Sequence, residues 1–165
     1  MNPIFSLPIP SLTIYQPWAS LCAIGAKEYE TRGRHTKFRG KFLIHAGKKD
    51  PYACMDEETA IIAEELFFKA GLSCYFGALP LGAIIAVAEL VGCYLIYHPS
   101  NQYGYVDDGV ISGKIGFMPV SEQEQLFGDW SVGRYAWKLA NVQMLDEPIP
   151  CRGQQGLWTY EGEKS

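Results

Sequence analysis

The sequence predicts an α+β fold: a small mixed β-barrel of five to six strands, with a short helix after the first strand and a longer helix inserted later. Three observations support this class. Short apolar runs recur along the chain between glycines and prolines, which is typical of strands. One stretch, residues 56–70, has helical periodicity instead. The composition, 48% hydrophobic and 19% charged residues, is that of a globular protein.

At 165 residues the chain has the size of one domain with a single core. We therefore expect a single domain over residues 1–165. The first ten residues hold three prolines and are expected to form an extended lead-in (1–10). The charged tail (161–165) is expected to be frayed, as the ends of chains often are.

The first quarter of the chain predicts three strands and a short helix. A short apolar strand is expected at 12–15. Pro17 suits the first position of the helix, because its fixed φ and missing N–H fit there, and Gly25 suits its end. Two strands follow, at 29–32 and at 41–46.

Residues 56–70 predict the longer helix. Three acidic residues open it, where they complement the helix dipole, and Gly71 ends it. We expect this helix to pack on the sheet without chemistry of its own. Its expected apolar stripe consists of Ile61, Ile62, Leu66 and Phe67.

The most apolar stretch, residues 82–97, predicts a long, bent strand, because Gly82 and Gly92 disfavour a helix interior. Its one charge, Glu89, is expected to be either paired or functional, since an unpaired buried carboxylate is costly. Residues 98–120 contain four glycines and two prolines. They predict a long, mobile loop of the kind that borders a binding site.

The last part of the chain predicts a helix and two strands. Ser121 is expected to cap a short helix that ends at Leu126, with Glu124 completing an S-x-x-E capping box. The remaining elements are a strand at 135–145, a turn at 148–156 and a final strand at 157–160.

The charge distribution narrows the classes of function. A net charge of −4 argues against a protein that coats nucleic acid with its whole surface. Residues 27–49, however, hold eight of the fourteen Lys and Arg against two acids, a net +6. A basic segment in an acidic chain suits one short polyanion better than nonspecific duplex binding. The alternative is a solvated pair of strands that is basic by chance.

Other features of the sequence indicate the expected compartment and give little support to metal catalysis. No signal peptide is expected, and no apolar run reaches the roughly 18 residues needed to span a bilayer. Five cysteines without a C-x-x-C motif indicate free thiols in a reducing compartment, so we expect a cytoplasmic protein. The three histidines lack ligand spacing and no nucleotide-binding fingerprint is present, so no metal or other cofactor is expected.

The densest group of charged side chains follows the first expected helix. Alternation along 29–32 puts Glu30 and Arg32 on one face of a strand, and Lys27 lies on the turn before it. We expect these three side chains to converge on an open pocket that attracts a nucleotide-like anion.

Several motifs follow one another at this point: Q-P-W-A-S-L at 16–21, G-x-K-x-x-E-x-R at 25–32, and R-G at 39–40 with I-H-A at 44–46. Later matches are L-G-A-I at 81–84, F-G-D at 127–129, G-R-Y-A-W at 133–137 and G-Q-Q-G-L-W at 153–158. The sequence therefore resembles the ASCH domain family, particularly its bacterial and phage members, over roughly residues 12–160. The resemblance implies a PUA-like β-barrel with a cleft beside the first helix, used as an RNA-binding module.

The same resemblance also implies an enzyme as an alternative. Some compact ASCH proteins are amidohydrolases that remove the acetyl group from N4-acetylcytidine. Their G-x-K-T-x-T-x-R motif supplies a catalytic Lys and Thr, which act with a Glu elsewhere. Lys27 matches that lysine, but Glu28 and Glu30 replace the threonines. Gly33 is a second departure, because many relatives have a polar or aromatic residue there.

In the binding hypothesis, the partner is a short single-stranded RNA or a nucleotide or nucleoside, and no membrane is involved. Arginine forks grip phosphate oxygens, and Trp18 or Trp137 offers a stacking face unless both are core residues. Arg34 and Lys37 extend the basic patch. The candidate ligand-binding residues are Gln16, Trp18, Ser20, Lys27, Glu30, Arg32, Arg39, His45, Arg134 and Trp137.

In the enzyme hypothesis, Lys27 is the catalytic base or nucleophile on an N-acylated nucleoside. Glu30 or Glu89 would shuttle protons, with Ser20 or Thr31 as the hydroxyl group. An ion pair with Glu30 would hold Lys27 charged and make it a poor base. An exposed Lys27 without a carboxylate neighbour would therefore favour chemistry, and a tight Lys27–Glu30 pair would favour binding. A third hypothesis is that these charges only shape the structure.

Overall fold

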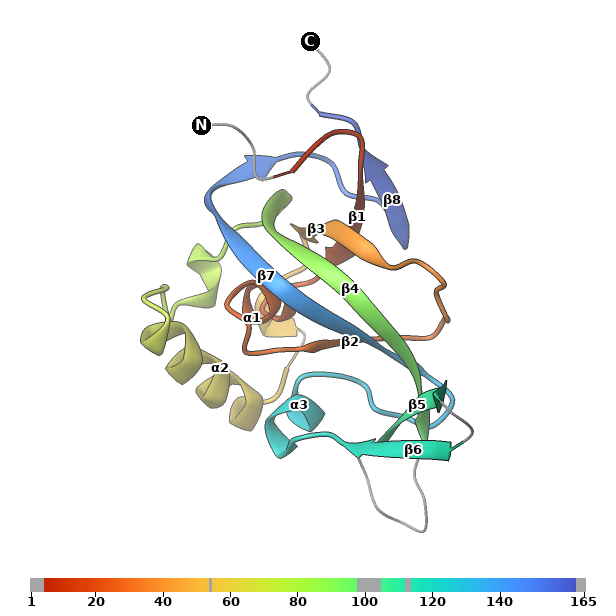
Figure 1. The fold of residues 1–165 in the computed structure, drawn as a ribbon. Helices are drawn as coiled ribbons and strands as arrows, with labels where there is room; N and C mark the ends of the chain where they lie inside the picture. Colours follow the sequence, from red (N-terminus) through yellow and green to blue (C-terminus); the bar gives the residue numbers. More distant parts are fainter. Residues whose placement is uncertain (1–4, 54, 98–104, 112–113, 163–165) are drawn as a thin grey trace. The chain divides into compact units, whose positions relative to one another are not determined.

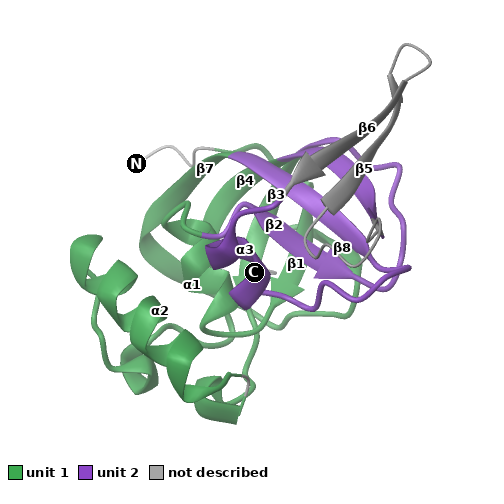
Figure 2. Cartoon of the chain, turned by 90° about the horizontal axis from the view of Figure 1, so that it is seen from below, with its two compact units in different colours: residues 1–26, 41–89, 141–165 green, residues 27–40, 90–140 purple. Residues whose placement is uncertain are grey.

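The computed structural model describes residues 5–53, 55–97, 105–111 and 114–162 (Figure 1). The chain forms two compact units, each made of separate segments (Figure 2). Unit 1 consists of Met1–Ala26, Lys41–Glu89 and Asn141–Ser165, and unit 2 of Lys27–Gly40 and Leu90–Ala140. Two long strands, β4 (Ala83–Tyr97) and β7 (Tyr135–Pro150), contribute to both units.

Unit 1 is built around three short strands and the neighbouring parts of the two long ones. β1 (Ile9–Ile14) runs parallel to β3 (Gly40–Ala46), with Leu12 opposite Ile44. On its other side, β1 is antiparallel to β8 (Leu157–Tyr160). Large side chains from these strands and β4 pack into one hydrophobic cluster, which stabilises the unit by removing apolar surface from water. Its buried members are Ile9, Leu43, Ile84, Val87, Trp158 and Tyr160.

The helices of unit 1 begin and end close to the predicted residues, although Pro17 precedes α1 and does not occupy its first position. α1 (Trp18–Ala23) follows Pro17, and its last five residues are all buried. α2 (Glu57–Lys69) is capped by Asp56, whose carboxylate accepts a hydrogen bond of 2.8 Å from the Thr59 N–H. The expected stripe of α2 is only partly correct, because Phe67 is buried whereas Ile61 is 60% exposed. Two single 3₁₀ turns complete the unit: η1 (Pro51–Ala53) and η2 (Phe76–Ala78).

Unit 2 holds a second hydrophobic cluster. β2 (Tyr29–Arg32) is antiparallel to the first part of β7, and α3 (Glu122–Leu126) follows Ser121. The rings of Tyr29 and Trp130 meet edge to face, with centroids 5.8 Å apart. The buried members of the cluster are Tyr29, Ile96, Val120, Trp130 and Ala136.

The α+β class is confirmed, with a mixed sheet, a short helix after the first strand and a longer helix later. Hydrogen bonds connect six strands in the order β2-β7-β4-β3-β1-β8. The expected loop at 98–120 is wrong for the stretches that form β5 (Tyr105–Ile111) and β6 (Lys114–Pro119), which pair with each other. Residues 98–104 and 112–113 of that expected loop lie outside the described residues. The PUA-like barrel and the single domain stay predictions.

Other boundaries shift by a few residues. β7 extends to Pro150, so the expected turn at 148–156 begins later than predicted. β1 begins at Ile9 and takes over the end of the expected lead-in. Among the described helices, none combines the length and the apolar character that crossing a bilayer requires.

Candidate functional site

The candidate residues that follow the first helix lie at the start of unit 2. Lys27 precedes β2, in which Glu30 lies opposite Trp137 and Arg32 opposite Tyr135. The alternation of the strand buries Tyr29 and Thr31 and leaves Glu30 and Arg32 partly exposed on the other face. The expectation that Glu30 and Arg32 share a face is therefore confirmed.

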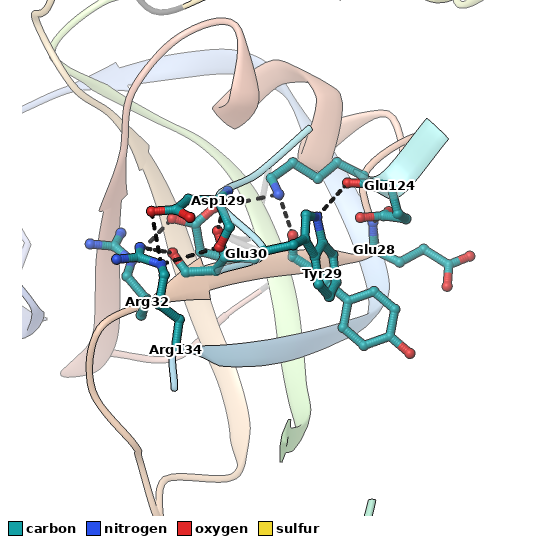
Figure 3. Close-up of polar contacts among 10 residues, drawn as sticks. Glu28, Tyr29, Glu30, Arg32, Glu124, Asp129 and Arg134 are labelled. Carbon is teal, nitrogen blue, oxygen red and sulfur yellow. Dashed lines mark hydrogen bonds and ion pairs between the residues drawn. The ribbon is translucent and has the colours of Figure 1, made fainter. Parts of the chain in front are cut away.

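Glu30 brings the two cations together (Figure 3). Its Oε2 lies 3.8 Å from Lys27 Nζ, and its Oε1 lies 3.0 Å from Arg32 Nε. A second pair lies beside them in Figure 3: Arg134 Nε is 3.2 Å from Asp129 Oδ2. We call these five residues the charge cluster. Every cation in it has a carboxylate neighbour.

Lys27 is the most deeply buried member of the charge cluster, at 1% exposure. Besides its contact with Glu30, its ammonium donates a hydrogen bond to the carbonyl oxygen of Tyr29. A buried ammonium needs such partners, because it has lost its hydration. The amino group of Lys27 thus faces protein groups rather than open solvent.

Asp129 and Arg134 form the more exposed pair of the charge cluster. The N–H of Ser131 donates a hydrogen bond of 3.1 Å to Asp129 Oδ1, and its hydroxyl donates to the same oxygen. These bonds, together with the charge of Arg134, hold the pKa of Asp129 below its usual value. Arg134 also donates a hydrogen bond of 3.3 Å to the carbonyl of Thr31. The guanidinium is thereby fixed beside β2.

Glu124 is a buried carboxylate that the sequence assigned to a helix cap. Ser121 does cap α3, because its hydroxyl accepts a hydrogen bond of 3.2 Å from the Glu124 N–H. The carboxylate of Glu124, however, accepts a hydrogen bond from the N–H of Glu28, so the expected capping box is only half formed. Its other oxygen has no hydrogen-bond partner among the described residues. Burial raises the pKa of Glu124, and the charge of Lys27 opposes that shift.

The segment after β2 carries three exposed cations. Arg34, Lys37 and Arg39 are all exposed. A side chain of β7 anchors the backbone of this segment: the indole N–H of Trp137 donates a hydrogen bond of 3.0 Å to the carbonyl of Arg34. Trp137 is only 5% exposed, so it anchors this segment and offers no open stacking face. Arg39 folds back on the segment, donating to the carbonyls of Thr36 and Phe38.

An aromatic pair that the sequence did not predict joins the same segment to the start of β7. The rings of His35 and Tyr135 meet edge to face, with centroids 5.4 Å apart at an angle of 74°. His35 is exposed and Tyr135 is half-buried. The signal was available in the sequence, since alternation puts Tyr135 on the face opposite Ala136, at the start of β7. We call this pair, the exposed cations of the segment and the two partly exposed arginines of the charge cluster the basic strip: Arg32, Arg34, His35, Lys37, Arg39, Arg134 and Tyr135.

The other nominated residues belong to unit 1. Gln16 is fully buried; its side chain accepts a hydrogen bond of 3.0 Å from the Ser20 N–H and donates one of 2.9 Å to the Pro80 carbonyl. Gln16 and Ser20 thus position α1, and Trp18 is half-buried at its start. Glu89 is paired, because it accepts a hydrogen bond of 2.8 Å from Asn141 Nδ2.

His45 is the remaining nominated residue, and it is 2% exposed on β3. Its Nε2 lies 3.2 Å from the Cys151 carbonyl, and its ring meets that of Trp158 edge to face. Burial lowers the pKa of His45. The structure thus joins Lys27, Glu30, Arg32 and Arg134 in one cluster, while Gln16, Trp18, Ser20, His45 and Glu89 serve unit 1.

Within the described part of the chain, no three His, Cys, Asp or Glu side chains gather as metal ligands would. No model of a known protein family matches the sequence. No curated protein is similar enough to count as a relative.

Proposed function

We propose that this protein binds short single-stranded RNA through the basic strip of unit 2. The observation that carries the proposal is the anchored segment after β2, where exposed cations flank an aromatic pair whose His35 ring is exposed. The resemblance to ASCH domains, which are regarded as RNA-binding PUA-like modules, supports the same function.

The cations of the strip suit phosphate groups. Among the described residues, Arg34 and Lys37 form no ion pair, so their charges are available to a ligand. Because the Arg34 carbonyl accepts a hydrogen bond from Trp137, the backbone at this residue is held in place before RNA arrives. Pre-ordering lowers the entropy cost of binding.

The aromatic pair suits an unpaired base. Single-stranded RNA is recognised largely by stacking of splayed bases on aromatic rings, at about 1–3 kcal/mol per base. His35 takes the stacking role that the sequence gave to Trp137, because its ring is exposed beside Arg34 whereas Trp137 is buried.

The geometry around Lys27 supports binding better than hydrolysis. A catalytic lysine needs a neutral amine that reaches the substrate. Lys27 instead has Glu30 at 3.8 Å, donates to Tyr29 and is 1% exposed. The N-acylated nucleoside hydrolase therefore remains the alternative, without a specific observation in its favour.

The experiment measures the affinity of the full chain for a labelled, short single-stranded RNA by fluorescence anisotropy, from about 50 to 200 mM salt. The double variant Arg34→Ala/Lys37→Ala is expected to weaken binding about tenfold or more. It should reduce the slope of log K against log salt by about 0.7 for each RNA phosphate that the protein no longer neutralises.

The matched control is Lys69→Ala, which removes an exposed lysine of α2 in unit 1. An equal loss in this control, or an unchanged affinity in the double variant, would overturn the proposal. His35→Ala is expected to weaken binding without changing the salt slope, because stacking releases no counterion.

A further inference from the structure

Unit 1 contains a pocket of 680 Å³ that the proposed RNA-binding strip does not use. It is lined by the ends of β1 and β3 and by the loop between β7 and β8. Pockets of roughly 300–1,000 Å³ hold small organic ligands and cofactors. The size therefore fits a small molecule rather than a single ion.

The lining of the pocket is positively charged. Lys48 and Arg152 line it, both are exposed, and no Asp or Glu is among its described lining residues. Neither cation forms an ion pair with a described residue. Two cations without a carboxylate beside them attract an anion, and Lys and Arg together are typical ligands of a phosphate group.

The loop between β7 and β8, which lines the pocket, is held close to His45. The Cys151 N–H donates a hydrogen bond of 3.0 Å to the Gly82 carbonyl, and the Cys151 carbonyl lies 3.2 Å from His45 Nε2. At Gly153 the backbone comes so near that a Cβ would lie 2.4 Å from His45 Cε1 and 2.5 Å from Nδ1. Only glycine leaves this edge of the imidazole uncovered by a side chain.

Lys48 is positioned in a similar way. A Cβ at Gly82 would lie 2.4 Å from Lys48 Cε, so the lysine stem runs directly over this glycine. Gly82 also has a φ of +64°, a conformation that favours glycine. The stem of Lys48 is thereby guided along the pocket wall.

His45 supplies an unused hydrogen-bonding atom. It lines the pocket and is 2% exposed, and its Nδ1 has no hydrogen-bond partner among the described residues. Because Nε2 faces a carbonyl, Nε2 carries the proton and Nδ1 is an acceptor. Burial lowers the pKa of His45 and so favours this neutral form. Buried acceptors are nearly always satisfied, so a donor on a ligand is the expected partner.

The remaining polar groups suit a ring or sugar with both donors and acceptors. Gln154 and Gln155 present exposed carboxamides, which can donate and accept, and Tyr15 lies half-exposed at the same pocket. A phosphate at one end and a neutral polar group at the other describe a nucleotide-sized molecule.

We propose that this pocket binds a small phosphorylated ligand of the nucleoside monophosphate class. Lys48 and Arg152 hold the phosphate, and a hydroxyl or amino group of the ligand donates to His45 Nδ1. The site is distinct from the basic strip, since all its lining residues belong to unit 1.

The experiment is calorimetric titration of the full chain with the four common 5′-ribonucleoside monophosphates. Separate arms use the unphosphorylated nucleosides and inorganic phosphate. At least one monophosphate is expected to bind saturably, and at least tenfold more tightly than its nucleoside and than inorganic phosphate. Absence of saturable binding by all four would overturn the proposal, as would inorganic phosphate binding equally well.

Variants locate the site. Lys48→Ala/Arg152→Ala changes two exposed side chains and is expected to weaken monophosphate binding at least tenfold, whereas Arg34→Ala/Lys37→Ala leaves it unchanged. If Arg34→Ala/Lys37→Ala weakened monophosphate binding and Lys48→Ala/Arg152→Ala did not, the proposal for the pocket would be overturned and the RNA proposal would stand. In the ¹⁵N NMR spectrum, the ligand is expected to shift the Nδ1 signal of His45 more than the Nε2 signal. An unmoved Nδ1 signal would remove His45 from the site.

Discussion

The charge cluster of unit 2 and the pocket of unit 1 use the same kinds of cation in opposite ways. In the cluster, each cation has a carboxylate within 3.8 Å. In the pocket, Lys48 and Arg152 line a hollow without a carboxylate. A basic motif in a sequence therefore does not by itself mark a ligand site. Cations that already have carboxylate partners stabilise the protein, and cations without them are available to an anion.

The largest expected effect tests the structural role of the cluster. Lys27→Ala should destabilise the protein by about 3–5 kcal/mol, because it removes the buried ammonium, leaving Glu30 with Arg32 alone and the Tyr29 carbonyl without its Lys27 donor. Urea unfolding measures this, with Lys69→Ala, an exposed lysine, expected to change the free energy of unfolding by less than about 0.5 kcal/mol.

The same variant separates structure from catalysis. If Lys27 were a catalytic base, Lys27→Ala would lose turnover of N-acylated nucleosides while the protein stayed about as stable as the wild type. Turnover by the wild type combined with that result would contradict the structural role of the cluster. An inert wild type across a panel of such nucleosides would set the enzyme hypothesis aside.

The next effect concerns the pocket wall. Gly153→Ala is expected to cost about 1–3 kcal/mol, because its Cβ would overlap His45 Cε1 at 2.4 Å. The matched control in unit 2 is Gly33→Ala, where the nearest atom to a Cβ is Arg134 Nη1 at 3.9 Å. Thermal unfolding of both variants makes the comparison. Equal stability of the two would mean that the loop does not press on His45.

The pH dependence of stability should differ between the two regions. Burial, with a smaller effect from Lys48, lowers the pKa of His45 from 6.5, so below about pH 6.5 the unfolded chain binds a proton that the folded chain excludes. This term makes stability fall as pH decreases from 6.5. The contribution of Glu124 to the pH dependence has the opposite sign. Burial raises its pKa from 4.5, so above pH 4.5 the folded chain keeps a proton that the unfolded chain has lost. This contribution makes stability fall as pH rises above 4.5.

Difference profiles isolate these two terms. Relative to the wild type, His45→Gln should remove the loss of stability below pH 6.5. Glu124→Gln should remove the loss of stability above pH 4.5. Chemical unfolding between about pH 4 and pH 8 provides the measurement. A difference profile that stays flat for either variant would show that the corresponding burial has no effect on proton binding.

The smallest expected effect comes from a variant that removes the carboxylate partner of Arg134. Asp129→Asn keeps the acceptor for Ser131 but removes the charge beside Arg134. We expect a loss of stability of only about 0.2–1 kcal/mol, because the pair is partly exposed. RNA affinity should rise severalfold and its salt dependence should steepen, since Arg134 becomes free to bind phosphate. Unchanged RNA binding would exclude Arg134 from the strip.

The sequence predicted most of the fold because its signals were local. Asp56 and Ser121 cap helices, Pro17 precedes one, and residues 83–97 form one long strand as expected. The strands at 105–111 and 114–119 were missed, because their glycines and prolines resemble loop composition. Strand pairing in such stretches depends on partners distant in sequence, which propensity does not describe.

The site was predicted less well, because proximity in sequence does not show what is buried. The alternation of β2 correctly placed Glu30 beside Arg32, but it could not show that Lys27 would be enclosed. Glu124 was assigned to its own helix, whereas its carboxylate bonds to Glu28, far away in sequence. The pocket was missed for the same reason, since His45 and Gly153 meet only in the folded chain.

The hydrogen bond from Trp137 to Arg34 has a consequence for how the strip can change. The indole holds the main-chain oxygen of residue 34, not its guanidinium, so the identity of the side chain there is irrelevant to the anchor. The side chain at position 34 can therefore be exchanged, by selection or by design, to change the preferred ligand while the segment keeps its anchor.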